Sequence, residues 1–177
     1  MISKRAFLGS LVCVAAAGPA RARLPETSTE QHETYMRLAI EEGRKNPVWP
    51  FGAVMVRPET GEVMARGVND SGADPILHGE IACMQDYVRR HGNRGWEALA
   101  LYTTGEPCSM CMSAIVWAGM GGVVFATSIE GIRRAGIDQI NIPARTVVEA
   151  SPFYSGTLRG GVLAAETDRM FLDRRRN

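Results

Sequence analysis

A histidine, a glutamate and two cysteines stand at spacings that suit a catalytic metal centre. His78 and Glu80 are separated by one glycine, and Pro107-Cys108-Ser-Met-Cys111 follows about thirty residues later. One imidazole and two thiolates would hold one zinc ion and leave its fourth position open to water, whose pKa zinc lowers towards ~7. Glu80 could take the proton of that water, pass it to a ring nitrogen and later protonate a departing amine. This chemistry is hydrolysis at an amidine-like carbon.

Two other interpretations of these residues stay open. A structural zinc site needs a fourth protein ligand, which His32 could supply, although its place at the start of an amphipathic helix favours simple exposure. Cys108 and Cys111 could instead form a redox pair or a disulfide, but neither explains the histidine and the glutamate. Three cysteines follow residue 22, and this odd number favours a metal site over a disulfide framework. Cys83 is expected to pack as a small buried apolar residue.

Periodicities predict an α/β fold in which helices cover both faces of a mixed sheet. Parallel pairing is expected where a helix connects two strands. The helices that carry the metal site begin near His78 and at Cys108, so both amino termini should converge at one end of the sheet, where their dipoles favour thiolates. The predicted helices are 30–44, 78–90, 108–118, 129–135 and 161–171, and the predicted strands are 51–57, 62–66, 99–103, 122–126 and 145–148.

Residues 1–22 are expected to be an export signal that precedes one domain at 23–177. Lys4 and Arg5 stand before an apolar run, 8–18, which ends in Ala20-Arg-Ala22, and this order is typical of cleavable signals. The run is shorter than the about 20 residues of a membrane span, so no membrane anchor is expected after cleavage. A buried amino-terminal helix is the alternative. Residues 3–8 also resemble the twin-arginine export consensus, with lysine in place of its first arginine. We expect a periplasmic protein, or a cytoplasmic one if the signal does not function.

The charge balance disfavours a nucleic-acid-binding protein. The chain has 20 Lys and Arg against 19 Asp and Glu, a formal net charge of +1. Cleavage after Ala22 would remove Lys4, Arg5 and Arg21, which leaves 17 basic against 19 acidic residues and a net charge of −2. Nucleic-acid binding needs a concentrated positive surface, and we interpret the three arginines at 174–176 as a solvated tail. A composition of 45% hydrophobic and 22% charged residues is typical of a globular protein.

His-x-Glu followed by Pro-Cys-x-x-Cys resembles the signature of the zinc-dependent cytidine deaminase superfamily. The resemblance covers residues 35–126 most strongly. It implies a three-layer α/β/α cytidine-deaminase-like fold with a mixed five-stranded sheet. Carried over to this chain, it also implies that His78, Cys108 and Cys111 bind one Zn²⁺ per subunit and that Glu80 moves protons.

Within that superfamily the chain is most similar to the branch of guanine deaminases, tRNA adenosine deaminases and fungal-type cytosine deaminases. Pro50-Phe-Gly-Ala-Val, Asp74-Pro-x-x-His78 and Glu106-Pro-Cys-x-Met-Cys resemble guanine deaminase, as does the segment 151–158. Leu77-His-Gly-Glu-Ile and Leu101-Tyr-Thr-Thr are similar to fungal cytosine deaminase. The resemblance therefore implies a guanine-type purine base or nucleoside as substrate, then a cytosine-type pyrimidine, then tRNA adenosine. A non-catalytic zinc-binding module comes last.

The resemblance also implies substrate contacts and a homodimer. Asn69 would bind the base, because a side-chain amide satisfies a ring carbonyl and an N–H together; a turn residue is its alternative. Trp117 and Phe51 would lie beside the ring, or else pack in the core, and Gly79 would complete the contacts. Glu130 is the nearest match to the acidic residue of guanine deaminases, shifted by one position. The branch commonly forms homodimers, in which the apolar segment 161–165 could pack.

Overall fold

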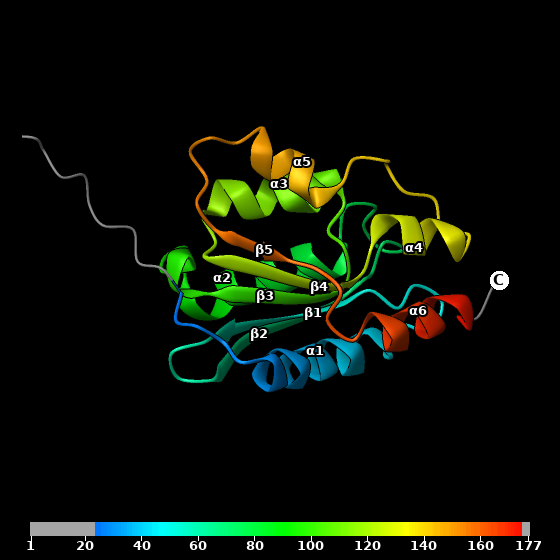
Figure 1. Ribbon diagram of the computed structural model, residues 1–177, viewed down its shortest axis with the longest axis horizontal. Coiled ribbons are helices and arrows are strands. Elements are labelled where there is room, and N and C mark those ends of the chain that lie inside the picture. The colour runs from blue at the N-terminus through cyan, green and yellow to red at the C-terminus, as the bar shows by residue number, and fades with distance from the viewer. Residues whose placement is uncertain (1–23, 175–177) are drawn as a thin grey trace, which may run out of the picture.

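Three layers make up residues 24–174, the part of the chain that the computed structural model describes (Figure 1). A mixed sheet forms the middle layer, with helices on both faces, as predicted. The expected export signal at 1–22 lies outside the described residues. Within residues 24–174, no helix is both long and apolar enough to cross a bilayer.

The sheet has five strands within the described residues, in the order β2-β1-β3-β4-β5. β1 pairs antiparallel with both β2 and β3, whereas β4 pairs parallel with β3 and β5 pairs parallel with β4. Every residue of β3 is buried, because helices cover the sheet on both faces. The strands are β1 Gly52–Arg57, β2 Glu62–Val68, β3 Ala100–Gly105, β4 Gly122–Thr127 and β5 Thr157–Arg159.

Two groups of helices cover the two faces (Figure 1). α1 (Thr29–Gly43) and α6 (Ala164–Leu172) contribute to one apolar cluster. α2 (Gly79–His91), α3 (Ser109–Ala118) and α5 (Ala144–Glu149) contribute to the other. α4 (Ile129–Arg134) follows β4, and a short 3₁₀ turn, Trp96–Ala98, precedes β3.

α1 begins at a capping box and packs closely on β1. The Ser28 side chain accepts from the backbone N–H of Gln31, and the Gln31 side chain accepts from the backbone N–H of Ser28, which satisfies two N–H groups at the helix start. A Cβ placed on Gly52 would lie 2.1 Å from the Gly43 nitrogen and 2.3 Å from the Ala39 oxygen. Only glycine at position 52 therefore lets the helix approach the strand this closely.

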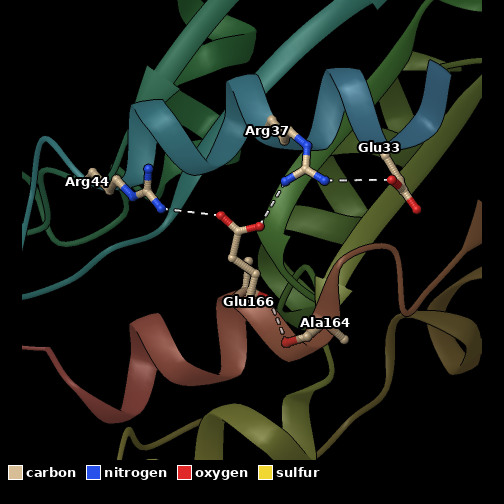
Figure 2. Close-up of polar contacts among 6 residues, drawn as sticks. Glu33, Arg37, Arg44, Ala164 and Glu166 are labelled. Atoms are coloured by element: carbon tan, nitrogen blue, oxygen red, sulfur yellow. Dashed lines mark hydrogen bonds and ion pairs between the residues drawn. The ribbon is translucent and has the colours of Figure 1, made fainter. Parts of the chain in front are cut away.

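Ion pairs hold α6 beside α1 (Figure 2). Glu166 of α6 accepts from Arg37 at 3.1 Å and from Arg44, the residue that ends α1, at 3.2 Å. Arg37 also lies 3.7 Å from Glu33. All four side chains are at least a third exposed, so each pair contributes only about 0–1 kcal/mol. These ion pairs therefore contribute little to the free energy of unfolding, although they help to set the position of α6 beside α1.

Buried contacts contribute more to the docking of α6. Phe171 is fully buried, and its ring lies 4.8 Å from that of Phe51; removing such a side chain typically costs about 3–5 kcal/mol. The Thr127 hydroxyl lies 2.7 Å from both the Thr167 hydroxyl and the Asp168 carboxylate. α6 is thus connected to β4 and to the residue that precedes β1.

The structure corrects the sequence predictions in the last third of the chain. Residues 145–148 were predicted as a strand because of Val147 and Val148, but they lie in α5, where both valines pack against the core. The fifth strand is instead Thr157–Arg159, whose three residues are too few to show a period. The last helix begins at Ala164 rather than at 161. Arg174 was interpreted as part of a solvated tail, yet its guanidinium donates to the carbonyls of Ala135 and Gly136.

Candidate zinc centre

The three predicted ligands lie where two helices begin. His78 precedes the first residue of α2 and Cys108 precedes the first residue of α3, both with extended backbone, and Cys111 lies in the first turn of α3. Neither His78 nor Cys108 caps its helix with a side-chain hydrogen bond, which leaves both side chains available to a metal. The positive ends of the helix dipoles favour the negative charge of the thiolates.

The distances between these side chains fit a tetrahedral zinc ion. His78 Nδ1 lies 3.6 Å from the sulfur of Cys108 and 3.6 Å from that of Cys111. Zinc bonds of about 2.0–2.1 Å to nitrogen and 2.3 Å to sulfur, at a tetrahedral angle, separate the two atoms by about 3.6 Å. Among the described residues, this is the one group of three or more His, Cys, Asp or Glu side chains close enough to hold a metal. His78, Cys108 and Cys111 therefore form a candidate zinc site with three protein ligands.

The two thiols ionise in sequence in the absence of metal. The Cys111 thiol donates to the Cys108 sulfur, and this hydrogen bond, assisted by His78, lowers the pKa of Cys108 to about 4. The same hydrogen bond and burial raise the pKa of Cys111. Hydrogen bonding to Cys108 also raises the pKa of His78, against the effect of burial. Metal binding must therefore displace the Cys111 proton, so zinc affinity falls as the pH falls.

Glu80 lies in the first turn of α2, beside these ligands and almost fully buried. Burial raises the pKa of its carboxyl, because desolvation penalises the charged form. The Thr103 hydroxyl, on β3, donates to Glu80 Oε1 at 3.1 Å. This contact orients the carboxyl group beside the ligands.

A cavity of about 170 Å³ opens onto the zinc site. Pockets for drug-sized ligands are about 300–1,000 Å³, so this cavity suits a smaller, compact molecule. Aromatic, amide, hydroxyl and carboxylate side chains all contribute to its walls. The lining residues are Trp49, Phe51, Asn69, Ser71, His78, Glu80, Glu106, Cys108, Ile137, Asp138 and Gln139.

Asn69 and Phe51, both predicted from the sequence, line this cavity. Asn69 is 5% exposed and donates its side-chain N–H to the Ser71 hydroxyl at 3.0 Å. Its backbone N–H donates to the Phe51 carbonyl at 2.9 Å. The amide keeps its carbonyl oxygen and a second N–H for a ligand, and the Phe51 ring supplies an apolar surface beside it.

Trp117, Gly79 and Glu130 do not line the cavity. Trp117 is 80% exposed and its ring lies 5.3 Å from that of Phe153, so it is neither a core residue nor a wall of its own chain's cavity. Gly79 is buried, and a Cβ there would lie 2.6 Å from the Phe51 carbonyl oxygen, which makes it a packing residue. Glu130 is exposed and lies 2.8 Å from Arg134.

The sequence interpretation missed the part of the cavity wall that follows α4. Ile137, Asp138 and Gln139 come directly after Gly136, which has a positive φ of 76° and ends that short helix. Glu106, quoted only as part of a motif, connects this segment to the metal site: its two oxygens accept from the backbone N–H groups of Ile129 at 2.9 Å and Ala144 at 2.8 Å. The position of Glu106 next to Pro107 was the sequence feature that could have identified it as a residue of the site.

Cys83 and His32, both considered in the sequence analysis, lie outside the site. Cys83 is fully buried, as predicted, and burial raises its thiol pKa well above the usual value. His32 was expected to be simply exposed, but it is partly buried and its Nδ1 lies 2.9 Å from the Tyr102 hydroxyl. This places it on α1, on the opposite face of the sheet from α2 and α3, so it does not close the metal site.

Comparisons with known proteins relate this chain to zinc-dependent deaminases. The family model for the cytidine and deoxycytidylate deaminase zinc-binding region matches residues 29–127, which include all three ligands and Glu80. The chain is 34% identical to guanine deaminase of Bacillus subtilis (strain 168), over 72% of this chain and 86% of that protein. It is 31% identical to a probable cytosine deaminase of Schizosaccharomyces pombe, over 60% of this chain and 68% of that protein. It is 36% identical to the tRNA-specific adenosine deaminase of Bacillus subtilis (strain 168), over 54% of this chain and 61% of that protein.

A solved structure extends the likeness to nearly the whole chain. The structure of guanine deaminase from Nitrosomonas europaea superposes with a TM-score of 0.70, covering 96% of this chain and 94% of that one. The two sequences are 20% identical over this range, so this likeness shows a shared fold.

Replacing Cys108 with serine should reduce zinc content from one ion per chain to near zero, because a serine hydroxyl does not replace a thiolate ligand. Metal analysis after dialysis measures this. Cys83→Ser is the matched control and should retain one ion, since Cys83 lies outside the site. Full zinc loading of a folded Cys108→Ser protein would contradict the assignment.

Proposed function

We propose that this chain, which belongs to the cytidine and deoxycytidylate deaminase family and is a hydrolase of C–N bonds, deaminates a small base or nucleoside of the guanine type. The observation that carries the proposal is the compact cavity that places Glu80, Asn69 and the Phe51 ring around one zinc site. The relation to guanine deaminase over most of both chains supports the same substrate.

The residues divide the reaction between them. His78, Cys108 and Cys111 hold the zinc, which when bound supplies an activated water nucleophile. Glu80 accepts the first proton of the water and transfers it to a ring nitrogen of the substrate; it then accepts the second proton, from the hydroxyl formed at the reacting carbon, and passes it to the departing amine. The carbon–nitrogen bond breaks, a carbonyl forms with the oxygen of water, and ammonia leaves. Thr103 keeps the Glu80 carboxyl aligned throughout, since it donates to Oε1.

The cavity walls favour a planar base with both donors and acceptors. Asn69 offers a carbonyl and an N–H from one rigidly held amide, and Phe51 offers a ring face backed by Phe171. Asp138 adds a carboxylate at the exposed side of the cavity, which can accept from a ring N–H or an amino group. Guanine presents such donors beside its carbonyl, and this complementarity supports a purine of that type.

A cytosine-type pyrimidine is the second candidate. The relation to the Schizosaccharomyces pombe protein and the small cavity volume both support it. A tRNA substrate is third, because the net charge of −2 expected after signal cleavage offers little attraction to a polyanion.

Two further proposals concern the partner and the compartment. We propose a homodimer formed through the groove between α2 and α3, which is lined by Ile81, Met84, Val88 and Ala118. Val88 in this groove is 42% exposed, and Trp117 of α3 is 80% exposed; exposed apolar surface of this kind marks association sites. From the sequence of residues 1–22 we also propose export to the periplasm.

A panel of purine and pyrimidine bases and nucleosides, assayed for ammonia release with zinc-loaded protein lacking residues 1–22, tests the substrate. We expect the highest kcat/KM with guanine. Glu80→Gln should keep its zinc and lose about 10²–10⁴-fold in kcat, because it removes the proton-transfer group. Undiminished turnover in Glu80→Gln would remove Glu80 from the mechanism, and absence of ammonia across the whole panel would overturn the substrate proposal.

Val88→Glu should convert the dimer to a monomer in sedimentation velocity, since it places a charge in the apolar groove. Leu172→Glu, at a similarly exposed apolar position on α6, is the control and should leave the dimer intact. A native protein that sediments as a monomer at micromolar concentration contradicts the homodimer.

Fusion of residues 1–25 to a reporter should deliver the reporter to the periplasm. Replacing Lys4 and Arg5 together with glutamine should keep it in the cytoplasm, because export signals need a basic start. A fusion that stays cytoplasmic with the native residues refutes export.

A further inference from the structure

Arg174 connects two segments of the chain that contribute to the cavity lining. Its Nη1 donates to the carbonyls of Ala135 at 2.6 Å and Phe171 at 3.1 Å, and its Nη2 donates to the carbonyl of Gly136 at 3.1 Å. The same guanidinium lies over the indole of Trp49, 5.8 Å from the ring centroid. These contacts connect α6, the end of α4 and the segment before β1.

Both ends of this connection lead directly into the cavity. Ala135 and Gly136 immediately precede Ile137, Asp138 and Gln139, which form one wall. Trp49 also lines the cavity. We call Trp49 together with residues 137–139 the cavity rim.

An arginine suits this position for three physical reasons. Its planar fork of N–H groups can serve several carbonyls at once, which the single ammonium of lysine cannot do in the same geometry. The carbonyls of Ala135 and Phe171 belong to the last turns of α4 and α6, where the helix dipole favours a cation. A guanidinium also stacks well on an indole face.

The anchor that places Arg174 is itself firm. α6 is held by the burial of Phe171 and Thr167 and by the Glu166 ion pairs to α1 (Figure 2). Arg174 follows this helix by two residues. The guanidinium is therefore held on a docked element, and it can fix the rim, whose residues come from loops.

We propose that Arg174 is a positioning residue that holds the cavity rim in the shape that binds the substrate base. This role rests on the deaminase function proposed above. Trp49 would cover one side of the base and Asp138 would meet its polar edge, so both contacts depend on the spacing that Arg174 sets. The proton-transfer group is supported independently, because Glu80 is oriented by Thr103 and by the start of α2.

This separation predicts an effect on substrate binding more than on chemistry. Loss of the charged hydrogen bonds in Arg174→Ala should raise KM about tenfold, while kcat should stay within about twofold because the zinc site and Glu80 are unchanged. Arg174→Lys keeps the charge but not the planar fork of N–H groups, so its KM should lie between those of the native protein and Arg174→Ala. Arg169→Ala is the matched control: Arg169 is exposed on α6 and borders the hollow beside Arg44, away from the rim.

A second measurement does not need turnover. Hydrogen exchange of zinc-loaded protein should become faster in Arg174→Ala for peptides that cover residues 46–52 and 135–142, and should be unchanged for peptides from α2. If the native enzyme deaminates none of the bases tested, the proposed function fails while this exchange result still decides the role of Arg174. Unchanged exchange at the rim, a fall in kcat with unchanged KM, or equal effects of Arg174→Ala and Arg169→Ala would each overturn the proposal.

Discussion

The meeting of two helix amino termini at one end of the sheet is the constraint on which the site depends. His78 and Cys108 occupy the positions just before α2 and α3, and Cys111 lies one turn into α3. The backbone at His78 and Cys108 is extended, and neither side chain caps its helix with a hydrogen bond. Unpaired N–H groups and aligned dipoles then favour thiolate charge. The close approach of β1 to α2 requires the missing side chain of Gly79, against the Phe51 carbonyl.

Three glutamates have different roles in this structure. Glu80 is buried, and burial raises the pKa of its carboxyl, as is common for groups that transfer protons in active sites. Glu106 uses both oxygens to hold backbone N–H groups at the starts of α4 and α5, which connects the metal-site loop to the segment that forms the cavity wall. Glu166 is on the surface and fixes α6 beside α1 (Figure 2). These three residues are of the same type, so their burial and hydrogen-bond partners decide which one transfers protons and which ones hold structural elements in place.

The sequence predicted the metal site more completely than the cavity around it. Ligand spacing and helix starts are local properties, so His78, Cys108, Cys111 and the layers of the fold could all be predicted from chemistry, periodicity and family resemblance. The helical structure of residues 145–148 could not be predicted in this way, because burial against α3 overrides the strand preference of valine in α5. Residues 137–139 lie between Ile129 and Ala144, whose backbone N–H groups donate to Glu106, and Ile137 belongs to the same apolar cluster as Phe171 of α6; no spacing rule encodes these tertiary contacts. Trp117 shows the reverse case: the family resemblance implied that it lies beside the substrate ring, but its side chain lies on the exposed surface of its own chain.

The central claim is a zinc ion with three protein ligands and one position left for chemistry. X-ray absorption at the zinc edge of the native protein measures this directly, because sulfur and the lighter ligands differ in scattering and in bond length. We predict two sulfur ligands at about 2.3 Å and two nitrogen or oxygen ligands at about 2.0–2.1 Å, one of them water. A shell with three or more sulfurs, or a zinc ion enclosed by four protein ligands, would contradict a catalytic centre at His78, Cys108 and Cys111.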